Sequence, residues 1–419
     1  MTKLGILAAA ALAPLVIGTA VHATPRPDPD PARSTLVGWS VLPTATYVPG
    51  SARSGHWTAG NAAIPAPYPG QPVQGFSATH ALADGSSLVM SDNGFGAKAN
   101  SADFDLAVHR IRPDLRTGRT AYEGLVFNLS DPRRYVPWTI WRDGGCISAA
   151  SLPAGYACPT RDRVLTGWDF DPESMQVAKD GTFWFGEEFG PYVLHTNDRG
   201  ELLEPPIPTP GVRSPSNPTL GGATPNLANS KGYEGMAISP NGHVLHPMLE
   251  GATAEDQASG RGADLRIYTV ADGEFQDGFL RYPMESAAHA LGDFIMVNRH
   301  QGLVIERDNL QGSAAVFKRI YLVDLRDKDR DGYVDKTLLV DLMDVRNPYR
   351  LGGRDETFTF PYFTIEDVEI VDAQTIAVMN DNNFPATGGR GTDVPDVNEY
   401  LQIRLDHPLK VHSRLLPHG

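Results

Sequence analysis

ESMQVAKDGTFWFGEE, residues 173–188, holds two short strand-like stretches on either side of the turn Lys179-Asp180-Gly181. A carboxylate stands at each end of the segment, Glu173 at the start and Glu188 at the finish. A hairpin with its turn near the middle returns its last residue to the side of its first. Both carboxylates are therefore expected at the open end of one antiparallel hairpin.

The same pattern, two strand-like stretches on either side of a turn, occurs five times along the chain and is degenerate at 291–306. The end residues lie 15 or 16 positions apart in each case, at 77–92, 173–188, 234–250, 291–306 and 366–381. A third strand-like stretch follows each hairpin, as at 106–111 and 319–324. Repeated antiparallel meanders with little helical periodicity are typical of propeller blades. The strands of a β-sandwich would not place an acid at the same hairpin position again and again.

The sequence therefore predicts an all-β fold, a β-propeller built from antiparallel four-stranded sheets. Five blades are visible in the repeats, and the strand-like stretch 36–43 is expected to help close the ring. One or two degenerate blades would bring the total to six or seven. We expect the propeller domain to occupy residues 36–412.

The N-terminus has the pattern of a secretory signal peptide. Residues 1–23 combine Lys3 with an Ala-rich apolar stretch and end in Val21-His22-Ala23, a small-residue cleavage pattern. A membrane anchor is disfavoured because Pro14 and Gly18 interrupt the stretch, and no later window is apolar enough to span a bilayer. Residues 24–35 are expected to form a disordered linker. The predicted location is extracellular or periplasmic.

The net charge limits the classes of binding partner, and the cysteine content indicates how the two thiols are used. The net charge of −14 argues against nucleic acid and anionic membranes as partners and suits a protein that holds divalent cations. We expect a monomer that binds a small-molecule phosphate or ester. The two cysteines, Cys146 and Cys158, are expected to form a disulfide in an oxidising compartment, because two thiols alone do not make a zinc site.

The open ends of the hairpins should meet at one mouth of the propeller axis. We expect an acidic funnel there, with cations and the side chains of Lys231, Arg299 and Arg307 as its neutralisers and Asn382 beside them. Hard divalent ions prefer such clusters of oxygen ligands. The alternative is that many of these acids only hydrogen-bond to neighbouring blades. The expected funnel acids are Asp92, Glu173, Glu188, Glu234, Glu250, Glu306, Glu366 and Asp381.

Several short sequence motifs of this chain resemble those of a known family. The motifs are DPESM at 171–175, FWFGEEFGP at 183–191, NSKGYEGM at 229–236, ERDN at 306–309 and NDNNFP at 380–385. Together they resemble the phytase-like family of secreted bacterial proteins, labelled "esterase-like activity of phytase", over about residues 37–405. The resemblance implies a β-propeller and a phosphoester or ester substrate, but no established catalytic residue. Asp367 is a departure, because the family usually carries Gly at that position.

True β-propeller phytases use calcium ions in an acidic funnel to bind phosphate and activate water, without a covalent nucleophile. The leading hypothesis is therefore a calcium-dependent phosphoesterase or esterase-like hydrolase, with Glu173, Glu188, Glu234, Lys231 and Arg307 as its candidate catalytic residues. The alternatives are a non-catalytic ligand-binding propeller and a calcium-dependent lactonase-like hydrolase. The sequence contains no Gly-x-Ser-x-Gly elbow, phosphate-binding Gly-rich loop or His-Glu-x-x-His motif.

A second calcium site is predicted at DKDRDGYVD, residues 327–335. Acids at positions 1, 3, 5 and 9 with Gly at position 6 match a calcium loop, in which a backbone carbonyl at position 7 is a further ligand. Position 12 is Leu338 rather than Glu, so the loop is expected to join two strands and to bind weakly. The alternative is a charged, solvated hairpin tip. The expected ligands are Asp327, Asp329, Asp331, Tyr333 and Asp335.

Overall fold

The computed structural model describes residues 33–143, 146, 152–159 and 162–417. The predicted signal peptide and residues 24–32 of the predicted linker lie outside the described residues. Across the described ranges, no helix combines the length and the apolar character needed to cross a membrane.

The described residues fold almost entirely into antiparallel sheets, and the one α-helix among them, α1 (Ala254–Ala258), is short. Each blade begins with an innermost strand and continues outward along the chain. The first blade is β2 (Phe76–Ala81), β3 (Ser87–Ser91), β4 (Ala107–Asp114) and β5 (Arg119–Asn128). The second is β6 (Pro172–Val177), β7 (Phe183–Glu187), β8 (Tyr192–Thr196) and β9 (Ile207–Pro208).

The remaining strands form three more blades. The third contains β10 (Gly235–Ile238), β11 (Val244–Met248), β12 (Asp264–Ile267), β13 (Val270–Ala271), β14 (Glu274–Phe275) and β15 (Leu280–Pro283). The fourth is β16 (Ala290–Met296), β17 (Gln301–Arg307), β18 (Lys318–Asp324) and β19 (Asp335–Asp341). The fifth is β22 (Asp367–Ile370), β23 (Thr375–Met379), β24 (Asn398–Arg404) and β1 (Thr35–Leu42), with β20 (Val345–Arg346) and β21 (Thr357–Phe358) attached.

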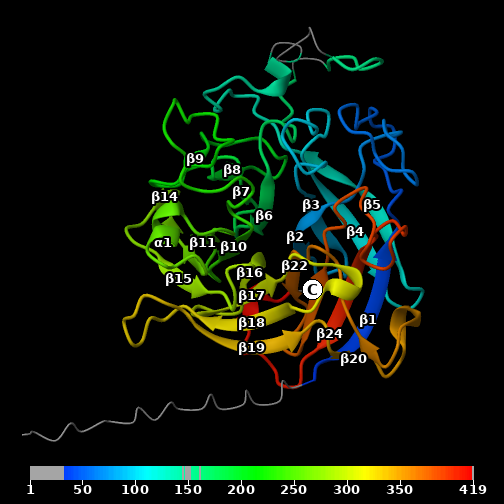
Figure 1. Ribbon diagram of the computed structural model, residues 1–419, viewed down its shortest axis with the longest axis vertical. Coiled ribbons are helices and arrows are strands. Elements are labelled where there is room, and N and C mark those ends of the chain that lie inside the picture. The colour runs from blue at the N-terminus through cyan, green and yellow to red at the C-terminus, as the bar shows by residue number, and fades with distance from the viewer. Residues whose placement is uncertain (1–32, 144–145, 147–151, 160–161, 418–419) are drawn as a thin grey trace, which may run out of the picture. The chain divides into compact units, whose positions relative to one another are not determined.

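The innermost strands close into a ring. β2 contacts β6, β6 contacts β10, β10 contacts β16, β16 contacts β22, and β22 contacts β2. Figure 1 shows these five strands around a common centre. The predicted β-propeller is confirmed, but the described residues form five blades, whereas six or seven were expected. The reason is that the described residues of the long segments between blades, such as 44–75 and 129–171, form isolated bridges and turns instead of further sheets.

The N-terminal strand closes the ring as predicted. β1 pairs antiparallel with β24 from Thr35–Arg404 to Leu42–Asn398, so the last blade combines strands from both ends of the propeller. This pairing ties residues far apart in sequence into one sheet, as full closure of an all-β ring requires. A single parallel pair, Val41 with Arg119, also joins β1 to β5 of the first blade.

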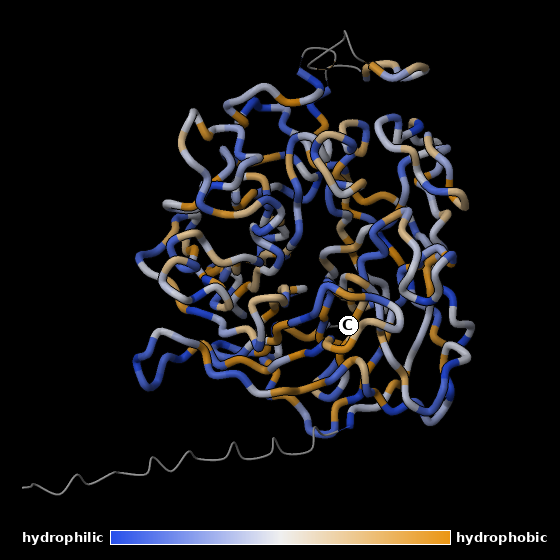
Figure 2. The backbone as a smooth tube through the Cα atoms, in the orientation of Figure 1, coloured by the Kyte–Doolittle hydropathy of each residue, from blue (hydrophilic) through white to orange (hydrophobic). Residues whose placement is uncertain are grey.

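Hydrophobic side chains fill the space between each pair of neighbouring blades. Ile295 and Ile305 of the fourth blade, for example, share a core with Val368 and Ile376 of the fifth. Equivalent clusters join the other pairs of neighbours around the ring. Figure 2 shows hydrophobic segments along strands such as β17, β18 and β24 and hydrophilic segments in the peripheral loops. Because apolar side chains are removed from water on both faces of each sheet, the blades hold one another in place.

The hairpin turns lie at the end of the ring opposite the acids. Gly85 and Gly181 occupy equivalent turns with φ of +81° and +84°, a conformation that glycine adopts without steric cost. The backbone N–H of each glycine donates to a carbonyl three residues earlier, that of Leu82 and that of Ala178, both at 3.0 Å. These turns direct both ends of each hairpin toward the opposite mouth of the axis.

Candidate functional site

The open ends of the five hairpins surround a cavity of about 320 Å³. Each of its acids, and Arg307, stands within two residues of an end of an inner strand or of the strand paired with it, so the blade repeat itself gathers them. Two cations, Lys231 and Arg307, also line it. Its eight carboxylates belong to Asp92, Asp171, Glu173, Glu188, Glu234, Glu250, Glu366 and Asp381.

Seven of the eight acids expected at the funnel therefore lie there, and Glu306 does not. Its carboxylate accepts hydrogen bonds from Tyr282 Oη at 2.8 Å and Lys336 Nζ at 3.0 Å, so it joins the third and fourth blades. The register shifts at Gly292 on the paired strand β16 just as it does at Ser77 and Glu173 in the first two blades, so the equivalent of Asp92 and Glu188 is Arg307. Successive side chains of a strand point to opposite faces. Arg307, the next residue, consequently faces the funnel in place of Glu306.

Two other expected members also lie elsewhere. The Asn382 side chain is buried, accepts from the Gly75 backbone N–H at 3.1 Å and donates to the Asp396 carbonyl at 3.1 Å, so it joins loops behind the funnel. Asn383 lines the cavity instead. Arg299 lines a separate cavity with His300, near the hairpin turns.

Arg307 is the central cation of the funnel. Its side chain is 4% exposed, and Nη2 lies 3.3 Å from Glu234 Oε1, 3.5 Å from Glu250 Oε1 and 3.2 Å from Glu366 Oε1. Nη1 donates to Asn309 Oδ1 at 2.7 Å. One guanidinium thus holds carboxylates from two further blades at fixed positions.

Lys231 differs from Arg307 in its access to solvent. Nζ pairs with Glu250, yet the lysine side chain is 36% exposed. Its loop is held by the neighbouring residue Gly232, whose backbone N–H donates to Glu188 Oε1 at 2.9 Å. Lys231 is therefore the cation able to meet a ligand that enters the cavity.

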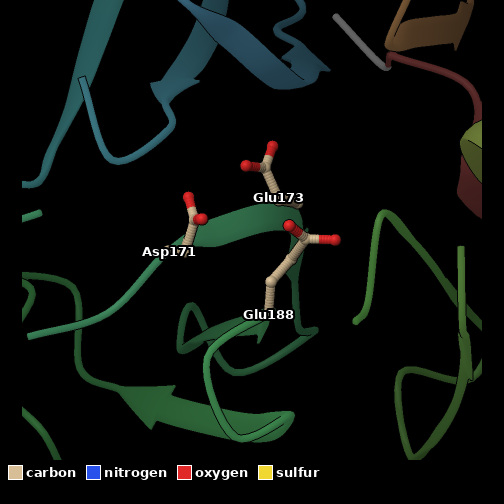
Figure 3. Close-up of side chains that lie close together, drawn as sticks. All are labelled: Asp171, Glu173 and Glu188. Carbon is tan, nitrogen blue, oxygen red and sulfur yellow. The ribbon is translucent and has the colours of Figure 1, made fainter. Parts of the chain in front are cut away.

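Asp171 was missed by sequence reasoning, although it stands in the DPESM motif two residues before Glu173. Single oxygens of Asp171, Glu173 and Glu188 lie within 4.8 Å of one another, and so do single oxygens of Glu188, Glu234 and Glu250. Figure 3 shows the first three carboxylates close together, two from the start of the second blade and one from the end of its hairpin. Asp171 Oδ1 is buried and has no hydrogen-bond partner among the described residues. This donor set fits a hard divalent cation that takes oxygen ligands.

Burial and crowding raise the pKa of most of these carboxyls. Burial, followed by the charge of Asp171, raises the pKa of both Glu173 and Glu188 well above the usual range. Burial and the charge of Glu250 raise the pKa of Glu234 to about 8, against the lowering effect of Arg307. Burial raises the pKa of Asp381 to about 6. Without added positive charge, the funnel therefore binds protons in a pH range where free carboxyls are ionised.

We expect the metal-free protein to lose stability as pH rises from about 4.5 to about 8. A carboxyl with a raised folded-state pKa binds its proton more tightly when folded, so its contribution is full below the unfolded value and lost above the folded one. For Glu234 these limits are 4.5 and about 8, and Glu369, a half-buried acid outside the funnel with a pKa of about 8, acts in the same direction. Thermal melting in chelator at a series of pH values measures this. A melting temperature that is constant or rises over that range would contradict it, and millimolar calcium should flatten the decline.

The loop at 327–335 joins β18 to β19, as predicted. Carboxylate oxygens of Asp327, Asp329 and Asp331 lie within 4.8 Å of one another, and Gly332 has φ of +85°. Asp335 is not in this group: its carboxylate lies 3.8 Å from Lys328 Nζ. The Tyr333 hydroxyl donates to Asp264 Oδ2 at 2.7 Å, which anchors the loop to the third blade.

Cys146 and Cys158 form a disulfide, as predicted, with their Cα atoms 5.8 Å apart. Cys146 packs with Ala102 and Trp141, and Trp57 contacts the same cluster. The bond therefore joins the segment between the first and second blades to a hydrophobic cluster that also contains Ala102 and Trp57.

The chain matches one family model and is similar to several known proteins. The model of the family described as "Phytase-like: Esterase-like activity of phytase" matches residues 71–384, a span that contains all ten charged residues of the funnel. An "Uncharacterized secreted protein" of Arthroderma benhamiae is 28% identical over 109 residues, and the match spans 20% of each chain.

Two solved structures are similar at low identity. The PQQ-bound form of an aldose sugar dehydrogenase from Streptomyces coelicolor is 12% identical, with a TM-score of 0.36, 90% of this chain covered and 99% of that one. A luciferin-regenerating enzyme is 8% identical, with a TM-score of 0.35 and 80% of each chain covered.

Proposed function

Because this chain belongs to the phytase-like family, we propose that it is a secreted, calcium-dependent hydrolase that cleaves phosphoesters or related esters in the funnel. One observation carries the proposal: among the described residues, eight carboxylates and two cations line a single cavity of about 320 Å³. Buried acids at this density repel one another unless they take up protons or cations. Proteins maintain such arrangements at sites that bind ions or perform chemistry.

Two overlapping groups of acids would hold the metal. Asp171, Glu173 and Glu188 form one group, and Glu188, Glu234 and Glu250 form the other. Calcium bound there would supply positive charge to attract an anionic substrate and to lower the pKa of water. Glu188 is common to both groups, so two neighbouring ions could share it.

The two cationic side chains of the funnel, Lys231 and Arg307, have separate roles. Lys231, at the edge of the cavity, would contact the anionic group of the substrate and orient it. Arg307 is too deeply buried for that contact, so it fixes the directions of Glu234, Glu250 and Glu366. The loop at 327–335 would hold a further, structural calcium ion, because it lies at a hairpin tip outside the funnel.

The direct test compares hydrolysis of 4-nitrophenyl phosphate, 4-nitrophenyl acetate and a simple lactone by the whole protein, in millimolar calcium and in chelator. We expect calcium-dependent release of 4-nitrophenol from one of the two esters, abolished by chelator and by Glu188→Gln. The matched control is Glu274→Gln, at an exposed position in β14. Activity that survives complete chelation would exclude the calcium-dependent mechanism. Binding of phosphate without turnover of any ester would indicate a ligand-binding propeller instead.

A further inference from the structure

Asp367 is a buried carboxylate with no partner. It is the first residue of the innermost strand β22, its side chain is 0% exposed, and neither of its oxygens has a hydrogen-bond partner among the described residues. Burying an ionised group without compensation is costly, and even a neutral acid loses free energy when its polar atoms are unpaired. A buried carboxylate with both oxygens unpaired is an exception that calls for a physical explanation.

The register places Asp367 in a layer directly below the funnel. In each blade, the inner-strand residue of this layer pairs with a residue of the second strand, and that second-strand residue stands two positions before a residue that faces the funnel. Asp367, for example, pairs with Met379, and Asp381 stands two positions after Met379. The equivalent residues of the other blades pair with Met90, Gly186, Met248 and Ile305. The five members of this layer are Ala78, Ser174, Gly235, Asp293 and Asp367.

Other members of the layer bind the next blade in the ring. Ser174 Oγ donates to the Tyr233 carbonyl at 2.9 Å, and Asp293 Oδ2 accepts from the Val368 backbone N–H at 2.9 Å. Asp367 has no such bond, although β22 contacts β2. Because Val368 directly follows Asp367, the bond from its N–H also brings the Asp293 carboxylate against the backbone beside Asp367.

The layer carries its charge on two adjacent blades. Its two acids are Asp293 and Asp367, and the remaining three members, Ala78, Ser174 and Gly235, are uncharged. Burial and then the charge of Asp293 raise the pKa of Asp367 well above its usual range. Neither Asp293 nor Asp367 lines the funnel cavity or the cavity of about 360 Å³ at the other end of the inner strands. The layer is therefore enclosed between the two.

We propose that Asp367 and Asp293 hold a divalent cation, calcium by its preference for oxygen ligands, within the ring of inner strands one layer below the funnel. Both free oxygens of Asp367 would be ligands, together with the remaining lone pairs of the Asp293 carboxylate. Two buried negative charges match one divalent ion. The ion would join the fourth and fifth blades to the centre of the ring, so its role is structural and does not depend on the proposed hydrolysis.

The test counts calcium bound per chain. Chelator-stripped protein is equilibrated with calcium chloride alone, and bound calcium and melting temperature are measured for the wild type and for Asp367→Asn. We expect the variant to bind one calcium ion fewer and to lose part of the melting-temperature gain that calcium gives the wild type. Asp293→Asn should have the same effect. Asp393→Asn, the same chemical change at an exposed position, should change neither quantity.

The Asp367→Asn variant also tests the alternative, in which Asp367 is protonated and binds no cation. If Asp367 is only a protonated acid, Asp367→Asn will bind as much calcium as the wild type and melt at the same or a higher temperature, which would overturn the proposal. A funnel variant, Glu188→Gln, separates this site from the proposed active site. The ion lost in Asp367→Asn should still bind to Glu188→Gln, even if the funnel proves to hold no calcium.

Discussion

Replacing Glu234 by Gln is expected to lower turnover of the ester substrate by about 10²–10³-fold, the usual effect of losing one electrostatic group from an active site. Glu234 belongs to a group of possible metal ligands with Glu188 and Glu250, and it also lies 3.3 Å from Arg307 Nη2. Glutamine keeps the shape and can still accept from Arg307, but it cannot bring a negative charge to a cation. The measurement is kcat of the metal-loaded enzyme, together with its calcium affinity.

The fold should tolerate this change. Burial already raises the pKa of Glu234 to about 8, so the neutral amide resembles the form that the metal-free protein prefers at neutral pH. The exposed Glu274→Gln change should leave turnover and stability unchanged. A loss of about 1–3 kcal/mol in the free energy of unfolding, with full activity per folded molecule, would assign Glu234 a structural role.

The funnel could be predicted because hairpin geometry converts spacing in sequence into position in space. Glu173 and Glu188 are 15 residues apart and meet at one mouth of the ring, as do Glu366 and Asp381. The same counting failed for Glu306 because the equivalents of Glu173 and Glu188 in the fourth hairpin are Gly292 and Arg307, so the expected pair stood one residue too early. A shift of one residue moves a side chain to the other face of a strand, and the sequence pattern contains no marker for it.

Other features depend on contacts that no local pattern records. Asp171 lies outside the hairpin count, because it precedes the inner strand and approaches Glu173 and Glu188 only through the path of the loop. The number of blades was overestimated because long segments rich in glycine and proline could equally hold short strands or irregular turns. That Asp367 has no hydrogen-bond partner among the described residues becomes visible only once the positions of the neighbouring donors are known.

Replacing Arg307 by Met is expected to destabilise the metal-free protein by about 3–5 kcal/mol at pH 8, the cost of removing one partner from a buried ion pair. Arg307 is the buried cation beside Glu234, Glu250 and Glu366, so its loss leaves their charges without compensation. Methionine retains much of the apolar stem, and the charge is therefore the main difference. Chemical denaturation in chelator measures the effect.

Two controls separate charge from packing. Arg350→Met removes a cation whose side chain is 60% exposed and paired with Glu356, and it should cost about 0–1 kcal/mol. Arg307→Lys restores the charge but not the planar geometry that reaches several carboxylates, so its stability should be intermediate. Calcium should recover part of the loss in Arg307→Met, because an ion in the funnel supplies the missing positive charge. An unchanged free energy of unfolding at pH 8 in chelator would show instead that the funnel acids are protonated there and need no cation.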